Sequence, residues 1–322
     1  MMRNILIAIF ICFALLCSGC NNKQNNQINN TDIKFSIQNG NRNLKFDSYP
    51  ERLVTLRQHI TETALELDLD KKIVGASSII DPPVPKHIQQ RYAKLPIIAE
   101  KYPSLEVLLA TNPNIIWVDR KWAFVKNQLG SMNNIEKNGI KIYLSESGFH
   151  DRSNIKYVYE DLQKMGKVFQ KEQRAAEVVK QMQNKIAKVQ DKLNGIPKKV
   201  KVLDYDSGRN NLAFVGCRCM AEELIRLAGG ENIFSDVDKE WASVNWEEIA
   251  KRNPDVIIVH EYRGISGVSK IAALKEKKLL QDVNAVKNNH FVIINLDEIY
   301  EGVRNAETVE KLAKSFYPER FY

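Results

Sequence analysis

The sequence predicts an α/β protein made of two similar halves that are joined by one long helix. The first observation is an apolar stripe in residues 171–195, where aliphatic side chains recur every three or four positions. This periodicity is typical of an amphipathic helix, which would be about 35 Å long at the usual rise per residue. Gly195 and Pro197 end it. A core helix is usually shorter, so we predict that this helix joins two lobes. The alternative is a long helix packed along a single domain.

The second observation is a short pattern that occurs once before this helix and once after it. In each copy a glutamate, Glu106 or Glu247, is followed at the same spacing by an Asn-Pro pair and then by an apolar run, 115–117 or 256–258. Each copy predicts a short helix with an acid in its first turn, then a turn, then a buried strand. The repetition predicts two related α/β halves, although helix-turn-strand units are common enough to resemble one another by chance.

The first twenty residues are similar to a bacterial lipoprotein signal. Arg3 is followed by the apolar residues 5–16 and by small residues before Cys20, which would be the lipidated residue of the mature protein. Cys17 stands where such signals usually have leucine, so a plain secretory signal is the alternative. Residues 21–47 are predicted to be a flexible, Asn- and Gln-rich tether followed by an edge segment. The mature protein is therefore expected outside the cytoplasm, anchored to the membrane by lipid.

Composition and charge limit the range of possible functions. The 322 residues are enough for two domains, and 44% hydrophobic with 27% charged residues is typical of a soluble globular protein. No apolar run beyond the signal could span a bilayer. The formal charge of +8 is spread along the chain without a nucleic-acid motif, so no nucleic-acid partner is expected. The charge predicts a solvated basic surface or a cleft that prefers an anionic ligand.

Neither catalysis nor a resident metal has support in the sequence. The chain lacks the HExxH, GxSxG and P-loop patterns, so we predict no catalytic residues, no enzyme activity and no bound cofactor. An exported metal-dependent hydrolase is the alternative. Cys217 and Cys219 are separated by one residue and have no second pair to complete a zinc site. Free thiols or a strained bridge agree better with this spacing.

Hydrophobic runs and turn residues place the remaining elements. We predict an edge hairpin at 33–46, a helix from about Thr61, a helix at 155–169, a loop at 205–215 and a closing helix at 306–316. The predicted strands outside the repeat are 53–56, 73–76, 140–144, 200–204 and 291–295.

Polar and aromatic side chains follow the predicted strands, where open α/β sheets bind ligands. Aromatic and cationic groups suit a bulky anionic or metal-chelated ligand. The predicted ligand-binding residues are Arg57, Gln58, His59, Arg120, Trp122, His150, Tyr205, Arg209, Phe214, Tyr262, Tyr300 and Arg304.

Several motifs together resemble the substrate-binding proteins of ABC importers for ferric siderophores, haem and cobalamin. The motifs are Arg52-Leu53-Val54-Thr55-Leu56, Ile60-Thr61-Glu62, Ile73-Val74-Gly75, Pro103-Ser104-Leu105-Glu106, Gly229-Gly230-Glu231-Asn232-Ile233-Phe234, Trp241, Val244-Asn245-Trp246-Glu247-Glu248 and Pro254-Asp255. The resemblance extends from Tyr49 to the end of the chain.

This resemblance implies two Rossmann-like α/β lobes joined by one rigid helix, with the ligand held in a cleft between them and little hinge motion. The expected division is an N-terminal lobe at 48–170, the interlobe helix at 171–195 and a C-terminal lobe at 196–322. The resemblance also implies that Glu106 and Glu247 meet arginines of the permease, although acids at helix starts also stabilise the helix dipole. We expect a monomer.

The ligand is the least determined feature. Arg57, Arg209 and Arg304 favour a ferric siderophore or haem, because guanidinium groups pair with anionic oxygens. A delivered iron complex is therefore the leading prediction. Cobalamin is the first alternative and would use the aromatic residues Trp122, Phe149 and Tyr262. The second alternative is a zinc or manganese receptor that uses His59, His150 and His260 with Glu261 or Asp297.

Overall fold

A computed structural model of the chain describes residues 34–77, 84–126, 128–209, 211–262 and 264–322. The predicted signal segment, its Cys20 and the tether up to residue 33 lie outside the described residues. The described part begins with a separate antiparallel hairpin of β1 (Phe35–Asn39) and β2 (Arg42–Phe46), which confirms the predicted edge hairpin. None of the helices in these ranges is long and apolar enough to cross a membrane.

The N-terminal lobe is built on a parallel sheet with the strand order β5-β4-β3-β6-β7 among the described residues. The strands are β3 (Leu53–Leu56), β4 (Ile73–Ser77), β5 (Ile97–Ala99), β6 (Ile115–Val118) and β7 (Lys141–Leu144). The helices are α1 (Gln58–Glu66), α2 (Gln89–Tyr92), α3 (Leu105–Ala110), α4 (Met132–Lys137) and α5 (Ile155–Val168), with short 3-10 turns at Lys121–Ala123 and Glu146–Phe149. Every residue of β3 and β6 is buried, as expected for central parallel strands.

The strand order explains where this lobe presents its functional side chains. After β3 the chain adds β4 and β5 on one side of the sheet, and it then crosses over to add β6 and β7 on the other side. The order in which strands are added therefore reverses between β3 and β6. Ligands bind outside the carboxyl ends of strands at such a reversal. Arg57 follows β3 and Asp119 follows β6, so the fold brings these two residues together.

The C-terminal lobe has a mixed sheet. Its described strands follow the order β11-β9-β8-β12-β13, and β10 pairs with β8 beside this path. The strands are β8 (Val200–Arg209), β9 (Leu212–Gly216), β10 (Gly230–Asn232), β11 (Trp241–Asn245), β12 (Val256–Glu261) and β13 (Phe291–Asn295). The helices are α7 (Met220–Leu227), α8 (Trp246–Arg252), α9 (Gly267–Glu276), α10 (Asn284–Lys287) and α11 (Asn305–Phe316), with short 3-10 turns at Lys278–Leu280, Leu296–Glu298 and Pro318–Arg320.

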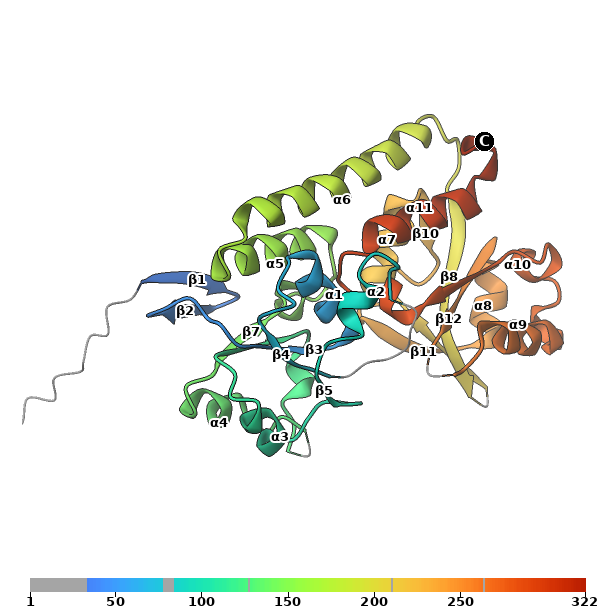
Figure 1. Cartoon of the computed structure of the whole chain (residues 1–322). Coiled ribbons are helices and arrows are strands. Elements are labelled where there is room, and N and C mark those ends of the chain that lie inside the picture. The colour runs from blue at the N-terminus through green and yellow to red at the C-terminus, as the bar shows by residue number, and fades with distance from the viewer. Residues whose placement is uncertain (1–33, 78–83, 127, 210, 263) are drawn as a thin grey trace, which may run out of the picture.

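The interlobe helix is α6 (Glu172–Lys192), and it packs on α5 of the first lobe and on α11 of the second (Figure 1). Its buried side chains are those of the predicted apolar stripe, from Ala175 to Val189. They belong to one hydrophobic cluster that includes Leu162 of the N-terminal lobe and Leu312 of the C-terminal lobe. Because both lobes bury apolar surface on the same helix, a hinge motion would expose that surface to water.

Several element predictions are confirmed and two are wrong. Each copy of the sequence repeat forms the expected helix, turn and buried strand, α3 with β6 and α8 with β12. The predicted loop at 205–215 is instead the continuation of β8 and its hairpin partner β9. The first helix begins at Gln58 rather than near Thr61, because the turn after β3 is confined to Arg57. The division of the chain at residues 170 and 195 stays a prediction.

Candidate ligand-binding site

Arg57 joins β3 to α1 in a backbone conformation that residues other than glycine rarely adopt. Its φ is 134° and its ψ is 148°, a region that costs roughly 1–3 kcal/mol for a residue with a side chain. The guanidinium lies over the ring of Tyr300, 4.5 Å from the centroid, and 5.6 Å from the centroid of Trp122. Such strain is kept where the surroundings need the side chain in one place, which points to a function for Arg57.

Asp119 neutralises Arg57 and is itself held firmly. Its Oδ2 lies 3.3 Å from Arg57 Nε, and its Oδ1 accepts hydrogen bonds from the Tyr102 hydroxyl at 2.7 Å and the Arg120 backbone N–H at 2.9 Å. Burial alone lowers the pKa of Arg57, but Asp119 and Tyr300 raise it to a net value above its ordinary one. The guanidinium therefore stays charged. Its Nη2 is buried and has no hydrogen-bond partner among the described residues.

Arg120 connects the two lobes. Its Nη2 lies 2.6 Å from Glu240 and 2.7 Å from Glu301, both in the C-terminal lobe. Glu301 also accepts a hydrogen bond of 2.6 Å from the hydroxyl of Ser153. Burial alone raises the pKa of Glu301, but Arg120 and Ser153 lower it below its ordinary value. Glu301 is thus a permanent anion that holds Arg120 in the cleft.

Aromatic side chains of the C-terminal lobe face these groups. Phe214 on β9 stacks on Trp241 at the start of β11, with 5.7 Å between the ring centroids. In the antiparallel pairing of β9 with β11, Phe214 lies opposite Ser243, so Phe214 and Trp241 are diagonal neighbours on the same face of the sheet. Trp241 in turn lies edge-on against the buried ring of His260 at 5.7 Å. A single aromatic surface therefore extends from the exposed hairpin into the core.

A buried charged cluster supports this aromatic surface. His260 Nε2 lies 2.6 Å from Asp204, and its Nδ1 lies 3.6 Å from Asp206. Burial lowers the pKa of His260, but the two aspartates outweigh it and raise the pKa from 6.5 to about 9. Lys270 donates hydrogen bonds of 2.6 Å to the backbone carbonyls of Asp206 and His260. The imidazolium and the ammonium together balance the two carboxylates.

The two lobes enclose a hollow of about 250 Å³ between these surfaces. Its lining residues are Asp119, Arg120, Trp122, Asp206, Phe214, Glu240, Trp241, Leu296 and Tyr300. Four aromatic rings and one leucine supply the apolar part, and one arginine faces three carboxylates. The hollow is therefore mainly aromatic and is not basic, which differs from the predicted anion-binding cleft.

The structure brings together part of the predicted set. Arg120, Trp122, Phe214 and Tyr300 line the hollow, and Arg57 lies directly behind the rings of Trp122 and Tyr300.

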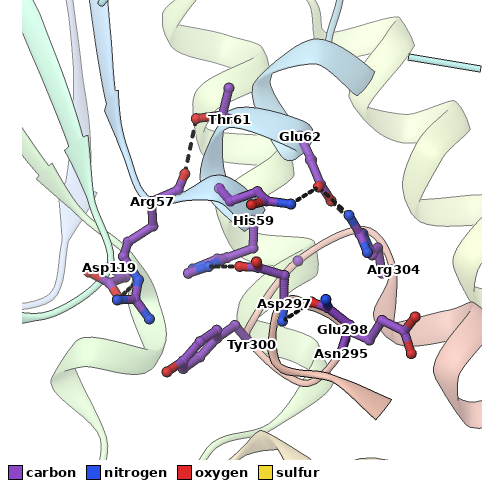
Figure 2. Close-up of polar contacts among 12 residues, drawn as sticks. Arg57, His59, Thr61, Glu62, Asp119, Asn295, Asp297, Glu298, Tyr300 and Arg304 are labelled. Atoms are coloured by element: carbon purple, nitrogen blue, oxygen red, sulfur yellow. Dashed lines mark hydrogen bonds and ion pairs between the residues drawn. The ribbon is translucent and has the colours of Figure 1, made fainter. Parts of the chain in front are cut away.

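Three predicted ligand-binding residues, Gln58, His59 and Arg304, are buried. Figure 2 shows His59 and Arg304 near Tyr300. His59 stacks on Tyr300 with 5.2 Å between the centroids, and its Nδ1 is 3.9 Å from Asp297. Arg304 forms an ion pair with the buried Glu62, with 2.6 Å from Nε to Oε2. Gln58 donates to the same glutamate at 3.1 Å. Gln58 and His59 are buried in helix α1 and Arg304 joins the lobes, so their direct contact with a ligand stays a prediction.

Four further predicted residues have other surroundings. Tyr205 is buried against Trp246. Tyr262 donates a hydrogen bond of 3.1 Å to Asp206, so it supports a lining residue. His150 is exposed and stacks on Tyr157 outside the aromatic hollow. The side chain of Arg209 lies outside the described residues.

The three histidines of the metal-receptor alternative do not converge. His59 lies in the lobe interface, His150 on the surface and His260 in the C-terminal core. Among the described residues, His, Cys, Asp and Glu form no group of three or more that could hold a metal ion. Cys217 and Cys219 are free and buried, which excludes the strained bridge considered from the sequence.

The predicted ligand-binding set lacks five lining residues, Asp119, Asp206, Glu240, Trp241 and Leu296. Trp241 could have been found, because it is one of the motifs that resemble the family. Its position before the second repeat instead suggested that it belongs to a connecting segment. Glu240 and Leu296 lie next to a strand start and a strand end, β11 and β13, and no local pattern distinguishes them from ordinary loop residues.

The repeated acids lie on the surface of their lobes. Glu106 is in the first turn of α3 and Glu247 is in the first turn of α8, and both are exposed. Neither forms a salt bridge with another residue in the described ranges. Each lobe therefore presents an unpaired carboxylate at an equivalent helix start.

A family model for periplasmic binding proteins matches residues 53–297, which is well over half of the chain. The chain belongs to this family. The uncharacterized ABC transporter substrate-binding lipoprotein YvrC of Bacillus subtilis (strain 168) is 22% identical over 98% of this chain and 97% of its own. A vitamin B12-binding protein of Yersinia pestis (strain Pestoides F) is 25% identical over 75% of this chain and 80% of its own. The crystal structure of a periplasmic binding protein from Veillonella parvula aligns with a TM-score of 0.80 and 27% identity over 88% of this chain and 97% of its own.

These matches confirm the resemblance stated from the sequence and the two-lobe α/β fold. The protein is a periplasmic binding protein that is similar over nearly its whole length to an ABC transporter substrate-binding lipoprotein.

Proposed function

We propose that this protein binds a metal tetrapyrrole, and a corrinoid in particular, for delivery to an ABC importer. The observation that supports a flat macrocycle is the aromatic lining, which consists of Trp122, Phe214, Trp241 and Tyr300. Flat rings stack on aromatic side chains and bury much apolar surface when they do so. The relative that binds vitamin B12 agrees with this proposal.

The charges around the hollow favour a corrinoid over an anionic iron complex. Every described arginine of the predicted basic cleft is already paired, Arg57 with Asp119, Arg120 with Glu240 and Glu301, and Arg304 with Glu62. An anionic chelate would meet more carboxylates than arginines in the hollow. Its binding would also remove water from these carboxylates, which costs free energy. A corrinoid presents neutral amides to the same groups.

A ferric siderophore or haem, the leading prediction from the sequence, is the second candidate. One specific observation favours it. Arg57 Nη2 is a buried donor with no hydrogen-bond partner in the described part of the chain, and a ligand oxygen would satisfy it. The aromatic lining would accept haem as well.

The remaining parts of the proposal concern delivery. We propose that Glu106 and Glu247 contact the permease, since both carboxylates are exposed on equivalent helix starts of the two lobes. The protein would be anchored through lipidated Cys20 and would act as a monomer without catalytic activity or a resident cofactor.

Isothermal titration calorimetry of the purified protein tests the ligand. We expect cyanocobalamin to bind with a dissociation constant below about 1 μM, or roughly 8 kcal/mol. Trp122→Ala should weaken binding without unfolding the protein, since Trp122 is 52% exposed. Leu279→Ala, at an exposed apolar residue outside the hollow, is the matched control. Tight binding of a ferric siderophore or haem without binding of cyanocobalamin would favour the second candidate instead.

A further inference from the structure

A second hollow adjoins the aromatic one and has a different chemistry. Its lining consists of three cationic side chains, three carboxylates and two further polar residues: Arg120, Arg218 and Lys239; Asp151, Asp238 and Glu240; His150 and Ser153. Arg120 and Glu240 line both hollows. Their ion pair of 2.6 Å therefore forms the partition between an aromatic compartment and a polar one.

Arg120 and Glu240 differ in how firmly the protein holds their side chains. Arg120 has a second anionic partner, because it also lies 2.7 Å from the buried Glu301. The side chain of Glu240 is 40% exposed, and burial raises its pKa above the ordinary value. A ligand that enters both compartments can thus displace Glu240 toward solvent while the charge of Arg120 stays in place.

The polar compartment offers cationic donors that the protein itself does not satisfy. The Nε of Arg218 is buried and has no hydrogen-bond partner among the described residues, although its Nη1 pairs with Asp238. Lys239 is exposed and forms no salt bridge within the described ranges. Ser153 fixes this compartment at the lobe boundary, because its backbone N–H donates to the carbonyl of Arg218 at 3.2 Å.

We propose that the polar compartment binds a phosphate-bearing arm of the ligand, while the aromatic hollow binds its flat ring. Arg218 and Lys239 would donate charge-assisted hydrogen bonds to the phosphate oxygens, with Arg120 between the two parts of the ligand. This inference rests on the proposed corrinoid function and narrows it. The ligand is a complete corrinoid with its nucleotide arm, and a corrinoid without that arm binds more weakly.

The test compares cyanocobalamin with dicyanocobinamide, which lacks the nucleotide arm, by calorimetry on the full protein. The wild type should bind cyanocobalamin about tenfold more tightly, as expected for one charge-assisted contact. Lys239→Ala should remove part of that preference, and Lys239→Ala combined with Arg218→Ala should remove all of it. Binding of dicyanocobinamide should stay unchanged in both variants. Lys251→Ala, at another exposed lysine of the same lobe, should leave both affinities unchanged.

The outcomes separate this inference from the proposed function. Equal affinities of the wild type for the two corrinoids would overturn the two-compartment inference and leave the corrinoid function standing. An equal loss of both corrinoids in Lys239→Ala would do the same, and this exposed residue can be replaced without a risk to folding. If neither corrinoid binds the wild type, the proposed function and this inference both fail.

Discussion

The two walls of the aromatic hollow are built in different ways. The N-terminal wall is formed by Asp119, Arg120 and Trp122, which follow β6, and Arg57, which follows β3, lies directly behind it. The C-terminal wall has Asp206, Phe214 and Trp241 on strands of the mixed sheet, and its remaining lining residues, Glu240, Leu296 and Tyr300, lie outside the strands.

The difference lies in where each wall keeps its charge. In the N-terminal wall the charged groups border the hollow, and a strained backbone holds Arg57 between two aromatic rings. In the C-terminal wall Asp206 and Glu240 border the hollow as well, and a further charged pair, His260 with Asp204, is buried beneath the aromatic surface. The comparison teaches that similar halves can share a fold while the C-terminal half adds a charged pair in the core beneath its aromatic surface.

Removal of the buried carboxylate of the C-terminal wall should have the largest effect. Asp204→Ala leaves the imidazolium of His260 without its closest partner in the core, so the free energy of unfolding should fall by about 3–5 kcal/mol. Urea denaturation measures this loss. Asp119→Ala is the matched change in the N-terminal wall, and it should cost less because the Arg57 guanidinium keeps its contacts with the rings of Trp122 and Tyr300. Equal losses for the two variants would contradict the comparison.

The pH dependence of stability should come from the C-terminal wall. Because folding raises the pKa of His260 from 6.5 to about 9, the stabilisation is fully present below pH 6.5 and is lost as pH rises through about 9. The loss should reach about 3 kcal/mol. Urea denaturation between pH 6 and pH 10 would show it. The variant His260→Gln should lack this component, and an identical pH profile in wild type and variant would show that another group is responsible.

The backbone strain of the N-terminal wall can be tested with two small residues. Arg57→Gly and Arg57→Ala remove the same guanidinium, but only glycine adopts a φ of 134° without strain. The glycine variant should therefore be more stable than the alanine variant by about 1–2 kcal/mol in thermal or urea unfolding. Equal stability would mean that the conformation at position 57 is not strained. Both variants should bind ligand more weakly than the wild type.

The smallest effect on stability and ligand affinity is expected at the two repeated acids. Glu106→Ala with Glu247→Ala removes exposed carboxylates far from the hollow, so ligand affinity measured by calorimetry should not change. Ligand uptake by cells should be lost if these acids contact the permease. Glu231→Ala with Glu276→Ala, at two other exposed acids, is the control for total charge. A loss of ligand binding in the first pair would show that the acids are not a docking pair.

Much of the site could be read from the positions at which strands end. Arg57, Trp122 and Tyr300 were predicted because ligands bind beyond the carboxyl ends of strands, and they lie at or directly behind the hollow. The same rule predicted that Gln58 and Arg304 lie in the site, but in the structure both lie in the interface between the lobes. The rule identifies the edge of a sheet but cannot tell whether a side chain points toward the ligand or toward the other lobe.

The sequence by itself determined the repeat, the amphipathic helix and the buried strands, because each depends on side-chain periodicity within a short segment. Only the tertiary structure decided the charge of the cleft. The pairs Arg120 with Glu240 and Glu62 with Arg304 join residues separated by 120 and 242 positions. Whether an arginine is free to bind an anion depends on which carboxylate the opposite lobe brings to it. That information is absent from any local pattern and arises only when both lobes pack on α6.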